Sequence, residues 1–112
     1  MDAKTFDKYF DEIFNKSEEI FLQARKEYAE NEDVFKNFEA LESILNISRE
    51  EVLFVYFYKH VLGISNYLKG VKKQRDSIEG RILDAINYLI MLYAMIKERK
   101  EKEKEQCDTG EK

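Results

Sequence analysis

The 112-residue sequence lacks proline and tryptophan, and it has only four glycines and one cysteine. Because proline and glycine are the residues that most often interrupt helices, their scarcity predicts long helices with few turns. The single cysteine, Cys107, excludes an intramolecular disulfide and a cysteine-based metal site. The segment after Met1 is acidic and amphipathic rather than a signal peptide, and no apolar run is long enough to span a bilayer. We therefore expect a cytoplasmic protein, in the host cytoplasm if the chain is viral.

The residues that dominate the chain are lysine, glutamate and aliphatic side chains, which favour helix. A chain of this length fits one domain with a modest core, which excludes a second catalytic domain. We therefore predict an all-α fold, a single-domain helical bundle of about four helices that is oligomeric. The bundle is expected to cover residues 1–105, and residues 106–112 are expected to form a disordered polar tail.

Apolar residues at helical spacing predict a first helix over Ala3–Ala29 and a second over Val34–Leu45. Residues 31–33 interrupt this pattern and offer an Asx-type cap for the second helix. Ser48 and Glu51 form a capping box, so a third helix begins there. Its body is apolar on more than one face and should be largely buried.

The segment Ser77–Ile96 is predicted to be the central helix. Nine apolar residues follow one another from Tyr88, so this helix needs neighbours on every side or an oligomer interface. The turn before it, Lys69–Asp76, contains Gly70, and Ser77 can cap the helix that follows.

Charge is unevenly distributed along the chain, whose net charge is −4. Residues 1–51 carry 14 acidic and 7 basic side chains, whereas residues 52–112 carry 9 acidic and 12 basic ones. This polarity favours charge-guided self-assembly or a phosphate-bearing ligand near the basic half. It argues against binding of duplex nucleic acid, which usually requires a basic face.

Asp84 and Asn87 lie three residues apart and so share one helix face. A carboxylate and an amide at this spacing could hold Mg²⁺, which prefers oxygen ligands. Alternatively, Asp84 is an acid favoured by the helix dipole, and Asn87 is a buried amide bonded to a neighbouring helix.

Lys59 and His60 lie within the apolar third helix, and His60 shares a face with Leu53. A buried imidazole is expected, either as a structural residue or over a pocket. An unpaired buried ammonium is costly, so Lys59 should reach the rim or meet an acid or a phosphate, with Asp84 as its natural partner.

Basic residues surround the start of the last helix, where free backbone N–H groups attract anions. A triphosphate could dock there, although an ordinary solvated loop is the alternative. These residues are Lys69, Lys72, Lys73, Arg75 and Arg81.

A series of short motifs between residues 26 and 96 resembles one family. In order, the motifs are KEYAENEDVFKNFEA, then KH, then DAINYLIML. They are similar to a group of small phage and prophage proteins labelled nucleotide modification associated, which itself resembles the all-α NTP pyrophosphohydrolases of the MazG type. The residues that carry this resemblance are Lys26, Tyr28, Asp33, Phe35, Asn37, Phe38, Lys59, His60, Asp84, Asn87 and Tyr88.

The resemblance implies a Mg²⁺-dependent nucleotide pyrophosphohydrolase, or a nucleotide-binding descendant of one. MazG-like enzymes hold Mg²⁺ with an ExxE and an ExxD pair. Asp84 is similar to the last acid of the second pair, whereas Arg81 stands where its Glu is expected. We predict Asp84 and Glu79 as metal ligands and His60 and Lys59 as catalytic residues, and we expect the ligand to be bound by Tyr28, Asn37, Asn87, Lys72, Lys73 and Arg75.

The alternative function is a non-catalytic helical interaction protein, for example a phage inhibitor of a host defence system. It would act through the acidic first helix and the apolar faces of the third and fourth helices. Both functions are compatible with a homodimer or a larger oligomer.

Overall fold

The computed structural model describes residues 1–28 and 30–110, with side chains through residue 106. Within these residues the chain forms four helices and no strand, which confirms the predicted all-α fold. The helices are α1 (Ala3–Arg25), α2 (Lys36–Leu45), α3 (Arg49–Leu68) and α4 (Ile78–Gly110). None of the helices in the described part of the chain combines the length and apolar character needed to cross a membrane.

Local hydrogen bonds set most of the helix ends. The predicted capping box is confirmed, because Ser48 accepts from the Glu51 N–H and the Glu51 carboxylate accepts from the Ser48 N–H. Ser77 Oγ accepts from the Gly80 N–H at 3.0 Å at the start of α4. Asn46 after α2 and Gly70 after α3 have φ values of 57° and 108°. Both residue types tolerate this left-handed conformation, so they end their helices cleanly.

Two helix ends differ from the prediction. The first helix ends at Arg25, because the N–H groups of residues 26–28 bond to carbonyls three residues back and tighten the chain into turns. The predicted end, Ala29, lies outside the described residues. At the other end of the chain, α4 continues to Gly110, beyond the Gln106 boundary at which the polar tail was expected to begin. The last two residues of that tail also lie outside the described residues.

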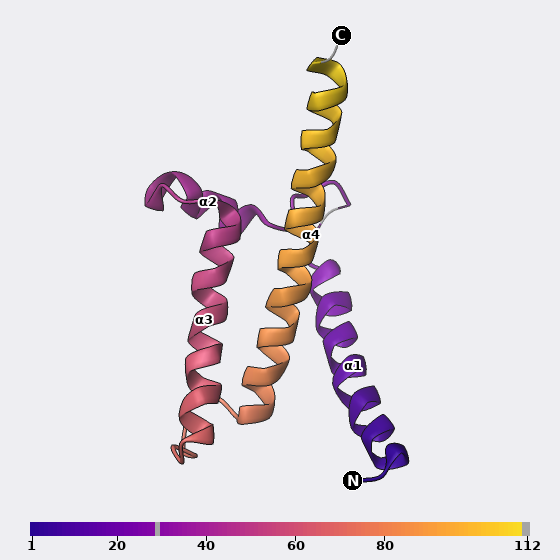
Figure 1. Cartoon of the computed structure of the whole chain (residues 1–112), viewed down its shortest axis with the longest axis vertical. Helices are drawn as coiled ribbons and strands as arrows, with labels where there is room; N and C mark the ends of the chain where they lie inside the picture. The colour runs from indigo at the N-terminus through magenta and orange to yellow at the C-terminus, as the bar shows by residue number, and fades with distance from the viewer. Residues whose placement is uncertain (29, 111–112) are drawn as a thin grey trace.

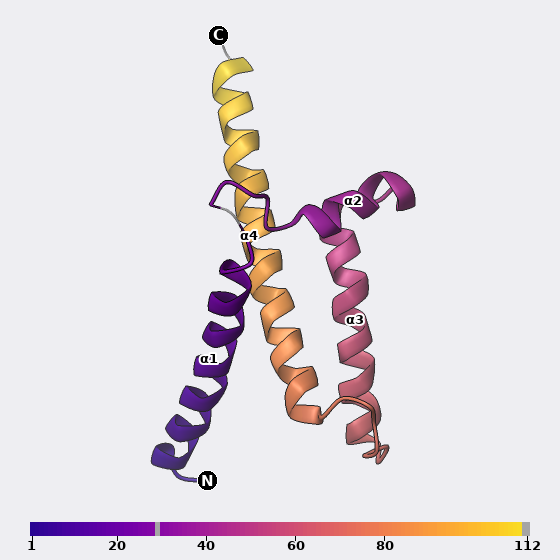
Figure 2. The ribbon, with the colours of Figure 1, turned by 180° about the vertical axis from the view of Figure 1, so that it is seen from behind.

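The helices form a layer in which α4 is the middle element. Figures 1 and 2 show α4 between α3 and α1, with α3 and α4 antiparallel and α2 across the start of α3. The helix contacts agree with this arrangement, since α3 and α1 both pack against α4, and α2 packs against α3. The charged C-terminal part of α4 extends beyond the other helices (Figure 1).

The core lies where α2 crosses the α3–α4 pair. Leu53 and Met95 are fully buried there and Phe35 is 8% exposed. Partly buried side chains pack around these three residues and close the core. They are Phe38, Tyr88, Met91 and Leu92.

Arg49 joins three helices at the edge of this core. It is 6% exposed, and its guanidinium donates to Glu39 at 3.1 Å, to Glu98 at 2.9 Å and to the Met95 carbonyl at 3.2 Å. Burial opposes the charge of Arg49, but the hydrogen bonds with Glu98 and Glu50 outweigh it and raise the pKa of the guanidinium. A buried arginine that is satisfied in this way fixes α2, α3 and α4 relative to one another.

The prediction that α3 is largely buried is wrong for this single chain, and the apolar run of α4 does not have the neighbours on every side that it needs unless an oligomer supplies them. Leu89 and Tyr93 on α4 are 49% and 68% exposed, and Phe54 on α3 is 54% exposed. The physical reason is the layer itself, since α3 and α1 cover only two flanks of α4 and leave a third side open.

The accessible surface and the radius of gyration both show that this arrangement is open. Its accessible surface is 9169 Å², whereas a compact monomer of 13.4 kDa should expose about 6,500 Å². The radius of gyration is 17.7 Å, compared with about 13 Å for a compact domain of this length. The projecting part of α4 accounts for some of this excess, but the exposed apolar side chains lie within the layer.

Candidate functional site

Two motifs that lie far apart in the sequence meet between α3 and α4. His60 of α3 is 6% exposed, and its Nε2 atom lies 3.8 Å from Asp84 Oδ2 of α4. The His60 ring also packs on the Tyr88 ring, with 5.5 Å between the centroids. A cavity of about 200 Å³ opens here, lined by Tyr56, Lys59, His60 and Tyr88. We name it the α3–α4 pocket.

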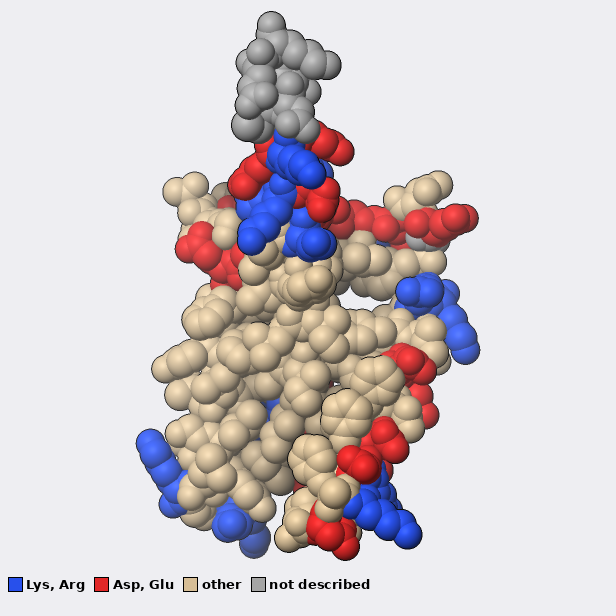
Figure 3. All heavy atoms as spheres, turned by 45° about the vertical axis from the view of Figure 1, so that its right-hand side comes forward, with Lys and Arg blue, Asp and Glu red and all other residues tan. Residues whose placement is uncertain are grey.

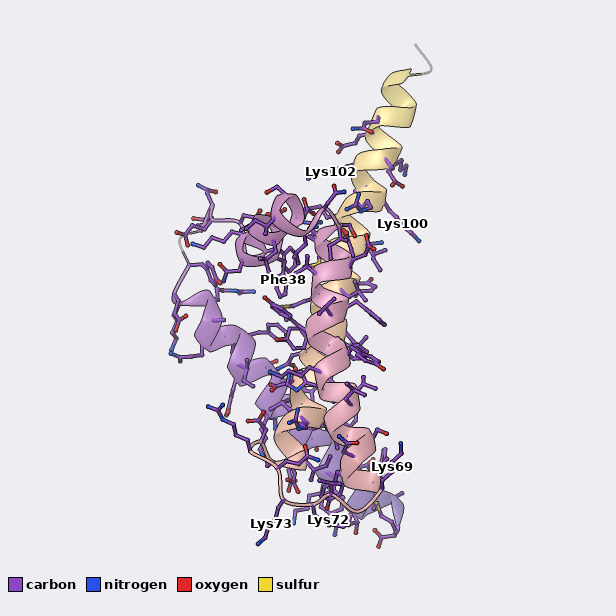
Figure 4. The ribbon with its side chains drawn as sticks, turned by 90° about the vertical axis from the view of Figure 1, so that its left-hand side faces the viewer. Phe38, Lys69, Lys72, Lys73, Lys100 and Lys102 are labelled. Carbon is purple, nitrogen blue, oxygen red and sulfur yellow. The ribbon has the colours of Figure 1, made fainter. Side chains whose placement is uncertain are left out.

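Aromatic rings form one wall of the α3–α4 pocket. Phe38, labelled in Figure 4, reaches from α2 to Tyr56 and Tyr88, with centroid distances of 5.6 and 6.5 Å. Tyr56 and Tyr88 also contact each other edge to face at 6.4 Å. These contacts hold the tyrosine rings in place, so the wall is formed before any ligand arrives.

Burial governs the electrostatics of the pocket. It lowers the pKa of His60 below the ordinary value of 6.5, and the opposing effect of the Asp84 carboxylate does not reverse this shift. Burial and the charge of Asp84 both raise the pKa of the Tyr88 hydroxyl. His60 and Tyr88 are therefore both neutral near pH 7, and Lys59 supplies the positive charge.

The His60 ring is not fully satisfied by the protein. Its Nδ1 atom is buried and has no hydrogen-bond partner within the described part of the chain. The 3.8 Å separation from Asp84 is also longer than a hydrogen bond. Because buried polar atoms are nearly always paired, this nitrogen indicates an interaction that the isolated chain does not provide.

Arg81 lies beside the pocket and has a structural role. Its side chain passes across Gly63 of α3 so closely that a Cβ atom at position 63 would clash with it. Arg81 Nε donates to Gln74 Oε1 at 2.7 Å, and Gln74 Nε2 donates to the Gly63 carbonyl at 2.9 Å. These three residues form a clamp at the turn between α3 and α4. Arg81, at the position where the resemblance implies a glutamate, is part of this clamp.

The two predicted metal ligands are not brought together. Asp84 faces His60, whereas Glu79 is exposed in the first turn of α4. Five residues along a helix correspond to a rotation of about 140°, so the two acids lie on different faces. Among the described residues, no group of three or more histidine, cysteine or acidic side chains is placed to hold a metal ion. Mg²⁺ stays a prediction that rests on the resemblance.

Asp84 pairs with a different residue from the one expected. The sequence predicts Lys59 as its partner, whereas the structure places Asp84 beside His60 and leaves Lys59 exposed at the pocket. The Lys59 side chain thus reaches the rim of the pocket, which was the other predicted possibility.

Three further candidates lie outside the pocket lining. Asn87 accepts a hydrogen bond from Ser17 Oγ at 2.6 Å, and both residues are buried, so this amide joins α4 to α1 as the alternative interpretation predicted. Tyr28 contacts Lys36, whose Nζ lies 5.5 Å from the ring centroid. Asn37 is exposed on α2.

The basic turn lies at the end of the α3–α4 pair. Figure 4 shows Lys69, Lys72 and Lys73 there, and the three residues are exposed together with Arg75. Lys72 Nζ packs over the Tyr67 ring at 4.4 Å. From His60 to Lys69 the distance along α3 is about 14 Å at 1.5 Å per residue. A ligand that used both the turn and the pocket would have to span that length.

A larger hollow of about 660 Å³ lies along α1. All of its lining residues belong to this one helix, between Lys4 and Asn15. One helix cannot enclose a ligand, so we assign no site to it.

Sequence reasoning did not identify Tyr56 as a pocket residue or Gly63 as a contact point. Tyr56 lies one helical turn before His60, and that spacing was a usable signal. Gly63 in the middle of an apolar helix was a second signal, because such a glycine often marks close approach of another group.

Comparisons of the chain with protein-family models, with curated proteins and with solved structures found no significant match.

Proposed function

We propose that this protein binds a small anionic ligand of the nucleotide class in the α3–α4 pocket. The observation that supports the proposal is the convergence of Lys59 and His60 from α3 with Tyr88 from α4 around one cavity, where Asp84 lies beside His60. Two aromatic rings, a cation and a neutral imidazole with an unpaired nitrogen suit a ligand that carries both a ring and a phosphate.

The pocket volume limits how much of the ligand enters. At about 200 Å³ it is smaller than the sites that enclose whole drug-sized molecules. We therefore assign the pocket to one ring, which would stack on Tyr56 or Tyr88 and accept or donate a hydrogen bond at His60. Lys59, at the rim, would pair with the first phosphate outside the ring.

Hydrolysis is a separate question from binding. The resemblance to MazG-type enzymes implies that Mg²⁺ would polarise a phosphoryl group and activate water. At the α3–α4 pocket this chain offers Asp84 as a carboxylate, and Glu79 lies on another face of α4. We therefore propose ligand binding as the function and treat turnover as an additional outcome to be measured.

The binding experiment is a calorimetric titration of the purified chain with a panel of NTPs and dNTPs, with and without Mg²⁺. Lys59→Ala should weaken binding of the responding nucleotide about tenfold, or about 1.4 kcal/mol. Lys100→Ala, which removes an exposed lysine from the projecting part of α4 (Figure 4), is the matched control and should bind normally. Absence of any binding across the panel would disprove the proposal.

The basic turn is the alternative docking site for the nucleotide, and the same titration distinguishes it from the pocket. If Lys72→Ala and Lys73→Ala weaken binding while Lys59→Ala does not, the ligand docks at the turn and the pocket assignment is wrong. Release of pyrophosphate or phosphate that depends on Mg²⁺ and is lost in Asp84→Asn would show turnover at the pocket.

A second candidate function is the non-catalytic interaction protein. It is favoured by the start of α1, where Phe6, Phe10 and Phe14 are 58%, 56% and 56% exposed beside acidic side chains. Such a protein would form a complex with a host protein that survives Asp84→Ala and is lost when the acids of α1 are reversed in charge. A complex that tolerates charge reversal along α1 would contradict it.

A further inference from the structure

The open side of α4 carries a regular apolar stripe. Its residues follow one another at intervals of four, three, four and three, which is the heptad spacing of packed helices. Figure 3 shows the broad face without charged side chains in the middle of the molecule, between charged residues at either end. We name this stripe the α4 seam, and it consists of Ile82, Ile86, Leu89, Tyr93 and Ile96.

Most of the α4 seam is exposed to solvent in the single chain. Ile82 and Ile96 are 38% and 41% exposed, and Leu89 and Tyr93 are 49% and 68% exposed. The opposite side of α4 holds Met95 and Asn87, which are buried. The seam is therefore a second apolar face of α4, distinct from the face that packs within the chain.

The surface area indicates what covers the seam. The chain exposes about 2,700 Å² more than a compact monomer of its mass. A standard protein interface buries about 800 Å² on each partner, which is less than this excess. A soluble monomer rarely exposes an apolar face of this kind.

We propose that a second copy of this chain covers the α4 seam, with α4 packed against α4 about a two-fold axis. A two-fold contact pairs the same surface on both copies, and a stripe at heptad spacing packs well against itself. This interface lies outside the α3–α4 pocket and goes beyond the proposed ligand binding, on which it does not depend.

Charge selects the parallel orientation of the two copies. The start of α1 and the basic turn lie at the same end of each chain (Figure 2). Residues 1–19 carry six acidic and three basic side chains, whereas residues 69–81 carry five basic and two acidic ones. If the two-fold axis runs along α4, the α1 flank of one copy faces the α3 flank of the other, so acidic and basic segments meet. An antiparallel pair would place α1 against α1.

Light scattering and sedimentation test the interface itself. The wild-type chain should have twice the mass of one 13.4-kDa chain at micromolar concentration. Leu89→Asp and Tyr93→Asp should give monomers that keep their helical circular dichroism. Ile44→Asp, at a 75% exposed site on α2, is the control and should remain dimeric. A wild-type chain that is monomeric would overturn the proposal, even if it associates with another protein. Dimers in both seam variants would also overturn it.

Cysteine cross-linking tests the relative orientation of the two copies. It also tests the interface itself if the aspartate variants fail to fold. In a Cys107→Ser background, Ile82→Cys and Ile96→Cys should each form a disulfide-linked dimer, because a parallel pair brings each residue beside its own copy. Cross-linking confined to Leu89→Cys, at the middle of the seam, would indicate an antiparallel pair and overturn the parallel arrangement. Absence of cross-links at all three positions would overturn the interface.

Discussion

The two ends of the helical layer differ in how they are held together. At the packed end, where α2 crosses α3, Leu53 and Met95 are fully buried and Arg49 of α3 is bonded to both α2 and α4. At the open end, toward the turn between α3 and α4, contacts are polar and the first half of α1 is largely exposed. There, His60 Nδ1 and Arg81 Nη1 are buried without a partner among the described residues.

We expect this difference to separate the residues that stabilise the fold from those of the proposed binding pocket. The packed end satisfies its own polar groups and supplies most of the buried apolar contacts. The open end contains the His60 side of the α3–α4 pocket, whose Tyr88 also packs against the core, and it leaves two buried nitrogens without a partner among the described residues. Substitutions at the packed end should therefore cause the largest losses in the free energy of unfolding, whereas substitutions in the α3–α4 pocket should act mainly on binding and on pH dependence.

The largest expected effect is at Leu53 in the packed end. Leu53→Ala should lower the free energy of unfolding by about 3 kcal/mol, because it removes a fully buried side chain and leaves a cavity. Leu68→Ala, on the same helix but at a 78% exposed site, should change it by less than about 0.5 kcal/mol. Urea denaturation at one protein concentration measures both, and equal effects would show that the packed end is not the stabilising region.

Arg49→Ala should have the next largest effect, a loss of about 2 kcal/mol. It removes one donor to the Met95 carbonyl and leaves Glu39 without its cation, whereas Glu98 keeps Lys102 at 3.6 Å, and both carboxylates keep some contact with water.

The matched control for Arg49 is Arg99→Ala, because Arg99 binds Glu50 while its own side chain is 50% exposed. Exposed ion pairs contribute little, so this variant should lose less than about 1 kcal/mol. If the two variants lose the same amount in urea denaturation, Arg49 does not join the helices as described.

The elements that the sequence predicted well are those set by short-range bonds. The capping box at Ser48, the cap at Ser77 and the left-handed residue Asn46 depend on neighbours within three or four residues. The burial of His60 could be predicted from its helix face, because Leu53 lies on the same face two helical turns earlier. Local spacing therefore located α2, α3 and the start of α4.

The pairings across the fold could not be read from spacing. Ser17 bonds to Asn87 70 positions away, and Arg49 bonds to Glu98 49 positions away. Asp84 faces His60 rather than Lys59 because the crossing of α3 and α4 decides which of two adjacent residues points inward. Magnesium and the family resemblance stay predictions, since the described residues neither assemble a ligand set nor match a known family.

At the open end, Gly63 and Arg81 should be coupled by about 1 kcal/mol. In the wild type, Gly63→Ala should leave stability nearly unchanged, because the gain of about 1 kcal/mol in helix propensity offsets displacement of Arg81 from Gln74. In an Arg81→Ala background there is nothing to displace, so the same substitution should stabilise the protein by about 1 kcal/mol. A double-mutant cycle in urea measures the coupling. Additive effects would exclude the clamp.

The smallest expected effect is the pH dependence that His60 contributes. Burial lowers its pKa below 6.5, with Lys59 and Arg81 acting in the same direction and Asp84 and Asp76 opposing them. Between the lowered pKa and 6.5 the unfolded chain binds a proton that the native ring rejects. The contribution of neutral His60 to the free energy of unfolding is therefore complete above pH 6.5 and is lost as the pH falls. The free energy of unfolding should change with a slope below the one-proton limit of about 1.4 kcal/mol per pH unit.

The variant His60→Gln distinguishes the pH dependence that His60 contributes from the pH dependence that the packed end contributes. Glutamine does not titrate, so the variant should show a flatter dependence of unfolding free energy on pH between about pH 7 and pH 5. At the packed end burial opposes ionisation of Glu50, but hydrogen bonds from Arg99 and Arg49 lower its pKa below 4.5, so its contribution is lost only at more acidic pH. Asp84→Asn should steepen the slope between pH 7 and pH 5, because it removes the charge that favours protonated His60. If His60→Gln keeps the wild-type slope, the open end does not hold a neutral buried imidazole, and the α3–α4 pocket loses the hydrogen-bonding group assigned to it.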